Sequence, residues 1–376
     1  MLSIPAAIRK NGLFQRRRDL LALGYSDFRI RKDLRAGRII RVRQGHYSVP
    51  DAVPAAIKAV RIGGRLTGLS ALKTYGHWVP KTDKLHVVVP SDARALRSAT
   101  DKQVRFATLN KKKAKKISIS WTDDAKVSRS PCPWRVSVID ALVHVLCTAD
   151  RETAIICLDS ALNVQRRADE GKSHLEGIRQ VQLAEIFAQA PARVQPWRAD
   201  VDGRAQSGGE TKFRLACEEA GIHFVPQSPV PDVEHHDGQI GPHTYVELNS
   251  VKHHVNVEQF EEDHRRQAQS TIWGNRVLNF TNKQVADDWD FCLEVMWQAL
   301  AEDAALTKTT DVWRGGPPMR DRSRGGADNP RRFVNDRPSW AKGKGKTKRK
   351  LRALAPAPSA PSAPSVAREK PGGASG

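Results

Sequence analysis

The densest set of side chains able to do chemistry lies in the stretch HHDGQIGPHTYVELNSVKHH, residues 235–254. Its composition predicts two short strands joined by a Gly-Pro turn, with Asp237 on the first and Glu247 on the second. Because side chains alternate across a strand, Glu247 and Asn249 share one face, opposite the apolar residues between them. Two carboxylates and an amide arranged in this way are oxygen ligands for a hard divalent cation.

Two histidines, His253 and His254, follow the second strand within a few residues. An imidazole beside a metal-bound water can accept the proton of that water, so either histidine is a candidate general base. The stretch therefore predicts a site for metal-assisted hydrolysis.

A third carboxylate precedes this stretch in the segment SGGETKFRLACEEAG. The segment predicts a helix, with Ser207 near its N-cap and Gly221 at its end. Glu210 falls on the same stripe as Phe213, so we expect it to face the sheet on which the helix packs. The alternative is a first-turn glutamate that favours the helix dipole and pairs with Arg214.

The elements that must position these groups follow one another in a regular order. After the helix come strands at residues 223–230, 233–240 and 244–251, a helix at 257–271, a strand at 275–285 and a closing helix at 285–300. This succession predicts an α/β fold with a mixed sheet.

The net charge of +21 is concentrated at the two ends of the chain of 376 residues. Residues 1–50 carry +9 and residues 304–376 carry +12, so the span between them is balanced. Basic regions at defined places predict contact with a polyanion such as DNA.

The basic N-terminal region predicts a helix at residues 14–23, a turn, and a second helix that begins after Ser26 and ends at Gly37. A strand, a tight turn at residues 44–45 and a return strand follow. This arrangement predicts a winged helix-turn-helix that binds DNA, whereas the simpler alternative is a small domain with a solvated basic face. The expected DNA-contacting residues lie on the second helix and on the wing: Arg29, Arg31, Lys32, Arg35, Arg38, Arg41 and Arg43.

Residues 51–165 predict a compact α/β domain with a strong strand, LHVVVP, and two apolar helices near its end. Lys111 to Lys116 is expected to be a basic loop or strand edge. The motifs ALGYSDFRIRKDLRAGRIIRVRQGHY, GLSALKTYGHW, LHVVVP and AIICLDSALN resemble the N-terminal half of proteins related to the type IV abortive-infection antitoxin. That resemblance implies a winged-helix DNA binder with an appended domain.

The C-terminal motifs resemble a second family. SGGETKFRL, an aspartate ahead of a turn, VEL-x-S followed by HH, FEEDHRRQ and WGNRVLNFT are similar, in this order, to the very-short-patch-repair-like group of PD-(D/E)XK endonucleases. The resemblance implies that Asp237 and Glu247 hold Mg²⁺, or Mn²⁺ in its place, with Glu210 contributing from its helix. It also implies that His253 or His254 activates the attacking water.

Asp263 and Arg266 resemble the D-x-x-R of the family, in which the arginine would clamp a phosphate; an ion pair between the two is the alternative. The sequence departs from the family at three places. Asn249 stands where relatives carry an acidic residue or lysine, Asn279 stands where they often carry arginine, and Asp237 lacks its usual apolar neighbour. Because Asn249 is a neutral ligand, the site would bind Mg²⁺ more weakly.

Residues 303–376 are rich in Gly, Pro, Lys, Arg and Ala, a composition that predicts a disordered basic tail. The five cysteines form no CxxC pair, which argues against a structural zinc or disulfide framework. No apolar run is long enough to span a membrane, and we expect a cytoplasmic protein.

The predicted organisation is a winged helix-turn-helix (1–50), an α/β domain (51–165), a helix and linker (166–206), a nuclease-like domain (207–302) and the tail (303–376). The predicted function is Mg²⁺-dependent cleavage or nicking of DNA. The alternative is a transcriptional regulator or antitoxin, with a cognate toxin as partner and a nuclease-like domain that does not cut.

Overall fold

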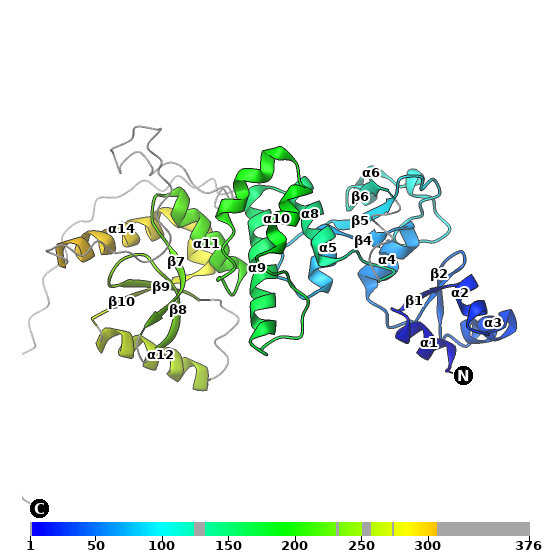
Figure 1. Ribbon diagram of the computed structural model, residues 1–376, viewed down its shortest axis with the longest axis horizontal. Coiled ribbons are helices and arrows are strands. Elements are labelled where there is room, and N and C mark those ends of the chain that lie inside the picture. The colour runs from blue at the N-terminus through cyan, green and yellow to red at the C-terminus, as the bar shows by residue number, and fades with distance from the viewer. Residues whose placement is uncertain (1, 124–131, 231–232, 250–256, 273, 307–376) are drawn as a thin grey trace, which may run out of the picture.

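The computed structural model describes residues 2–123, 132–230, 233–249, 257–272 and 274–306. Helices and strands alternate through these ranges, which confirms the predicted α/β class in its general form. The molecule is elongated: the N-terminal unit lies at one end, the sheet of the C-terminal region at the other, and the helices at residues 138–219 between them (Figure 1). Within the described ranges, no helix has the length and apolar character needed to cross a membrane.

The N-terminal unit combines three helices with a three-stranded antiparallel sheet in the order β1-β3-β2. Its elements are α1 (Ile4–Lys10), β1 (Phe14–Arg16), α2 (Arg17–Ala22), α3 (Asp27–Arg35), β2 (Ile40–Arg43) and β3 (His46–Ser48). The predicted helix pair and hairpin are present. Ser26 caps α3 by accepting a hydrogen bond from the amide of Arg29, and Ile30 is buried beneath the helix.

The predicted start of the first helix at residue 14 is wrong. Gly12 and Leu13 have φ values of +84° and +72°, so the chain leaves α1 through a left-handed turn. Residues 14–16 then extend along β3, and Phe14 enters the core. Helix α2 therefore begins only at Arg17.

The middle region packs helices against a second three-stranded sheet, ordered β4-β5-β6, in which β5 pairs antiparallel with β4 and parallel with β6. Its elements are α4 (Pro54–Ile62), β4 (Arg65–Leu66), α5 (Gly68–Thr74), β5 (Leu85–Pro90), α6 (Lys111–Ala114), β6 (Ile117–Thr122), α8 (Val138–Thr148), α9 (Arg151–Asp169) and α10 (Gln182–Ala188). The lysine run predicted as a loop or strand edge forms the short helix α6, because Asn110 caps it at the amide of Lys113.

One continuous hydrophobic core joins the N-terminal and middle regions, from Ile4 to Val194. The segment that we expected to be a helix and a linker contributes to this core through α10 and a 3-10 helix at Ala192–Asp200.

The C-terminal region forms a four-stranded sheet in the order β10-β9-β8-β7. Its elements are α11 (Gly208–Glu219), β7 (Val225–Val230), β8 (Val233–Gln239), β9 (Thr244–Asn249), α12 (Val257–Ile272), β10 (Arg276–Thr281), α13 (Asn282–Asp287) and α14 (Trp289–Leu306). Neighbouring strands β7, β8 and β9 are antiparallel, whereas β9 and β10 are parallel. The predicted order of helices and strands is thus confirmed. The strand predicted at residues 275–285 is too long, because Thr281 ends β10 and caps α13 by accepting a hydrogen bond from the amide of Gln284.

Phe213 of α11 is at the centre of a separate core under this sheet. Its ring lies 5.5 Å from that of Phe224, 6.0 Å from Phe280 and 5.6 Å from Trp289, between ring centroids. These contacts seat α11 on one face of the sheet, and through it they place Glu210 against the strands that carry Asp237 and Glu247.

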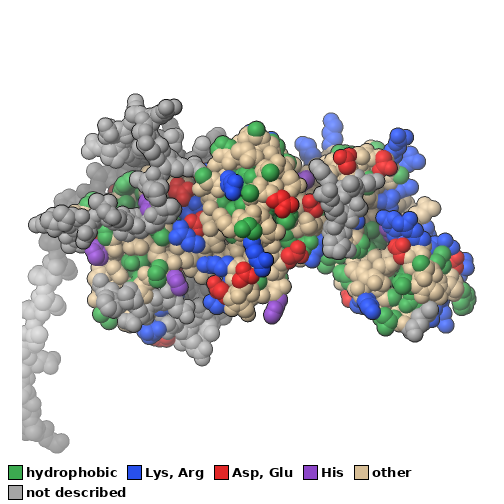
Figure 2. All heavy atoms as spheres, viewed as in Figure 1, with side chains coloured by type: hydrophobic (Ala, Val, Ile, Leu, Met, Phe, Trp, Pro, Cys, Tyr) green, Lys and Arg blue, Asp and Glu red, His purple; other side chains and the backbone are tan. Residues whose placement is uncertain are grey.

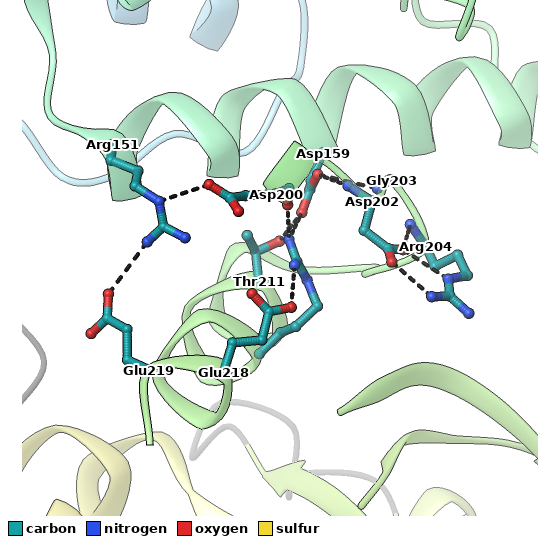
Figure 3. Close-up of polar contacts among 10 residues, drawn as sticks. Arg151, Asp159, Asp200, Asp202, Gly203, Arg204, Thr211, Glu218 and Glu219 are labelled. Carbon is teal, nitrogen blue, oxygen red and sulfur yellow. Dashed lines mark hydrogen bonds and ion pairs between the residues drawn. The ribbon is translucent and has the colours of Figure 1, made fainter. Parts of the chain in front are cut away.

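Buried charges also join α11 to α9 (Figure 3). Arg214 donates to Asp159 at 3.0 Å and to Glu218 at 2.8 Å, and the Arg214 and Asp159 side chains are 3% and 1% exposed. The second oxygen of Asp159 accepts the amides of Asp202 and Gly203. The alternative pairing of Glu210 with Arg214 is therefore wrong, because Arg214 faces α9 while Glu210 faces the sheet.

Candidate active site

Three carboxylates from three elements approach one another at the open end of the β8–β9 pair. Glu210 comes from the first turn of α11, where Ser207 caps the helix by accepting the Glu210 amide at 3.2 Å. Asp237 lies on β8 and Glu247 on β9. Gly238 pairs with Val246 in the ladder between these strands, and Asp237 and Glu247 are the next residues along the two strands.

The pKa values show how strongly these carboxylates influence one another. Burial, together with the charges of Glu210 and Glu247, raises the pKa of Asp237 to about 8. Burial is also the main cause of the raised pKa of Glu210, which is 5% exposed, and Glu247 adds to it. Without a cation, the cluster therefore retains a proton at neutral pH.

Hydrogen bonds fix one oxygen of each of the first two carboxylates. Glu210 Oε2 accepts the Gln206 amide at 2.8 Å and the Gln227 side chain at 2.9 Å. Asp237 Oδ2 accepts the amide of Leu248 at 2.8 Å. In the described part of the chain, Glu210 Oε1 and Asp237 Oδ1 accept no hydrogen bond, so these two atoms can take further ligands.

Glu247 is held by His236 of β8 and by Arg266 of α12. The Nδ1 of His236 lies 2.6 Å from Glu247 Oε1 and must donate to it, since a carboxylate only accepts. Its Nε2 lies 2.7 Å from the hydroxyl of Ser270 on α12. Arg266 contacts the same Glu247 oxygen at 3.4 Å and donates to the carbonyl of His235. Arg266 thus lies beside the predicted metal ligand.

The sequence analysis gave His236 no role, although this histidine is 1% exposed and orients Glu247. Adjacent residues of a strand point to opposite faces, so the position of His236 before Asp237 does not indicate a link to the site. Its contact with Ser270 depends on how α12 packs on the sheet, and no local pattern carries that information.

Asn249, at the end of β9, directs its amide away from the carboxylates. Its Nδ2 donates to the side-chain oxygen of Asn279 on the parallel strand β10 at 3.2 Å. Two of the three positions at which the sequence departs from the nuclease family, Asn249 and Asn279, are therefore in contact. The predicted bases His253 and His254, and the side chain of Asp263, lie outside the described residues.

Asp237 and Glu247 are the residues best placed to hold a metal ion. Among the side chains that the structure describes, no three His, Cys, Asp or Glu residues form a group that would enclose one ion. Mg²⁺ is ordinarily held by one or two carboxylates, with waters and substrate phosphates as its other ligands. The carboxylates of Asp237 and Glu247 fit that manner of binding, and the charge of Glu210 acts on Asp237.

A second candidate site is the basic surface of the N-terminal unit (Figure 2). Arg29, Arg31, Lys32 and Arg35 are exposed on α3, and Arg41 is exposed on β2. An exposed aromatic residue of α3, Phe28, accompanies these basic side chains.

Phe28 is 72% exposed. In a DNA groove, an exposed aromatic ring on such a helix can contact a thymine methyl group.

The other two predicted DNA contacts have different surroundings. Arg38 is bonded to the buried carboxylate of Asp33. Arg43 is partly buried and lines a cavity of about 620 Å³ with Arg16 and Arg65, between the N-terminal and middle regions. Burial lowers the pKa of Arg43, and Arg97 lowers it further.

No protein-family model matches this chain, and no curated protein is significantly similar to it. A functional proposal therefore depends on the geometry of these sites and on the motif resemblances described above.

Proposed function

We propose that this chain binds DNA through its N-terminal unit and hydrolyses phosphodiester bonds at the Glu210–Asp237–Glu247 cluster. The observation that carries the proposal is the convergence of three carboxylates from α11, β8 and β9. Burial, together with the charges of Glu210 and Glu247, raises the pKa of Asp237 to about 8. Like charges brought together under partial burial cost folding energy, and such clusters occur where a cation or a proton is needed for function.

Bound Mg²⁺ or Mn²⁺ would lower the pKa of a coordinated water and offset the charge that develops on the phosphate. Asp237 and Glu247 would hold the ion, since Asp237 Oδ1 and Glu247 Oε2 accept no hydrogen bond from the part of the chain that the structure describes. The order of elements and the mixed sheet agree with the PD-(D/E)XK resemblance.

The remaining residues orient these groups. His236 fixes the rotamer of Glu247 from the α12 side, and the amide of Leu248 fixes Asp237. Arg266, beside Glu247, is placed to bind a phosphate oxygen when a substrate displaces its present contact. Glu210 keeps the site negatively charged from the helix side and favours cation entry.

The N-terminal unit would bring the site to DNA. Four basic residues on α3, with Phe28, form a helix face of the kind that enters the major groove. The winged-helix resemblance and the basic hairpin support this role. The N-terminal unit and the sheet that carries the carboxylates lie at opposite ends of the elongated molecule (Figure 1). The DNA bound at α3 and the DNA that is cut would therefore be separate segments of one duplex.

A nicking assay tests the proposal. Purified chain is incubated with supercoiled plasmid in Mg²⁺ or Mn²⁺, beside Asp237→Asn and Glu247→Gln, with Glu294→Gln on the exposed face of α14 as the matched control. We expect relaxation by the wild type and the control, and a loss of at least about 100-fold in both site variants. If the wild type shows no metal-dependent nicking, or if Asp237→Asn and Glu247→Gln nick as fast as Glu294→Gln, the assignment is wrong.

A second function, a regulator that binds DNA and a cognate toxin without cutting, is favoured by the Asn249–Asn279 contact. Two neutral amides satisfy each other where the nuclease family supplies charge. Asn249→Asp separates the two functions. A nuclease short of one ligand charge should gain nicking activity in this variant, whereas a domain built only for binding should remain inactive.

A further inference from the structure

A large cavity in the middle region takes no part in the proposed function. It measures about 920 Å³ and is bordered by α4, α5, β5 and α6 and by the loop at residues 78–84. Its volume falls in the range of small-molecule and cofactor sites. The carboxylate cluster lies in the C-terminal sheet and contributes nothing to its wall.

The border of this cavity is strongly basic. Six lysines from four parts of the chain line it: Lys58, Lys73, Lys81, Lys84, Lys113 and Lys116. Asp83 is the one acidic residue among the lining side chains. In the described structure, none of the six ammonium groups forms an ion pair with a carboxylate. A single lysine on a surface is solvated by water and has no selective effect, whereas six lysines around one cavity create a positive potential that attracts an anion.

The interior of the cavity is apolar. Leu69, Val79, Leu85 and Ile117 contribute to its wall, and Trp78, which is 39% exposed, also lines it. Inorganic phosphate would contact the lysines but leave this apolar surface in water. An aromatic base would cover it, and the indole of Trp78 offers an aromatic face on which a base can stack.

We propose that this cavity binds a nucleotide, with its phosphates on the lysines and its base against the apolar wall. The nucleotide is either a free nucleoside triphosphate or an unpaired unit of a nucleic-acid strand, since both present the same base and phosphate chemistry. This site does not depend on whether the carboxylate cluster hydrolyses DNA.

Trp78 also connects the cavity to the C-terminal region. Its amide donates to Ser160 of α9 at 2.8 Å. A Cβ atom on Gly208 would lie 1.9 Å from the indole, so the ring packs directly on the first residue of α11. A base stacked beside Trp78 would therefore lie next to the helix that carries Glu210.

Equilibrium binding measures the site directly. ATP, adenosine, tripolyphosphate and a thymidine oligonucleotide are titrated into the full chain, and binding is followed by calorimetry at constant ionic strength. The test variant is Lys73→Gln with Lys113→Gln. The control is Lys111→Gln with Lys112→Gln, which removes the same charge from α6 at positions outside the cavity.

We expect the cavity variant to weaken nucleotide binding by about tenfold or more, because each lost contact is a hydrogen bond to a charged group. Lysine-dependent binding of ATP identifies a free nucleotide as the ligand. Lysine-dependent binding of the oligonucleotide without ATP binding identifies an unpaired strand. The proposal is overturned if both variants bind like the wild type, or if tripolyphosphate binds as tightly as ATP.

Discussion

Helix α11 carries two buried charged residues one turn apart, and they have opposite surroundings. Arg214 faces α9, where Asp159 and Glu218 lie 3.0 and 2.8 Å from its guanidinium nitrogens (Figure 3). Glu210 faces the sheet, where its charged neighbours, Asp237 and Glu247, have its own sign. One helix thus presents a compensated charge to α9 and an uncompensated charge to the strands.

The difference separates a structural role from a functional one. Every oxygen of Asp159 is bonded to an arginine, a hydroxyl or an amide, so the junction needs nothing from outside the protein. Burial raises the pKa of Asp159, and Arg214 offsets part of that rise. Within the described residues, the side chains that pair with the charge of the carboxylate cluster are His236 and Arg266, and both contact Glu247 at its edge. A bound proton or cation is therefore needed to balance the negative charge of the cluster.

The largest effect is expected from Arg214→Ala. This change leaves Asp159 buried beside an empty space and should lower the free energy of unfolding by about 3–5 kcal/mol. Urea unfolding of the two proteins at pH 7 measures the difference. The double variant Asp159→Leu with Arg214→Met should lose much less, because it removes both charges. A cost below about 1 kcal/mol for Arg214→Ala would show that the junction tolerates an unpaired carboxylate.

The surroundings of Glu210 could be predicted from the sequence, whereas those of Arg214 could not. Glu210, Asp237 and Glu247 were predicted because strand alternation, helix periodicity and element order are local signals. Arg214 was considered only as a partner of Glu210, four residues away on the same helix. Its actual partner Asp159 lies 55 positions earlier in the chain, on a helix whose packing against α11 has no signature in either segment.

A smaller effect, a few kcal/mol, is expected from Asp237→Asn, and it depends on pH. The folded-state pKa of Asp237, about 8, lies above that of an unfolded carboxyl. Between about pH 4 and pH 8 the unfolded chain therefore releases this proton first, and metal-free stability falls as pH rises. Asp237→Asn should be more stable than the wild type at pH 9, and nearly equal to it below pH 4.

Thermal unfolding in EDTA, followed across this pH range, measures the effect. Added Mg²⁺ should restore the wild type at pH 9, since a bound cation replaces the missing proton, and should do less for Asp237→Asn. Equal pH profiles for the two proteins in EDTA would mean that the cluster is open enough for water to shield its charges.

The smallest effect is expected at the rim of the α9–α11 junction. Arg151 lies 2.8 Å from Asp200 and 3.3 Å from Glu219, but its side chain is 33% exposed, against 3% for Arg214. Water can solvate the partners that Arg151 leaves behind, so Arg151→Ala should cost about 1 kcal/mol or less, and less again in high salt. The same urea experiment compares it with Arg214→Ala. Equal losses would show that charge pairing alone holds the junction, whereas the expected contrast means that burial decides how much each arginine contributes.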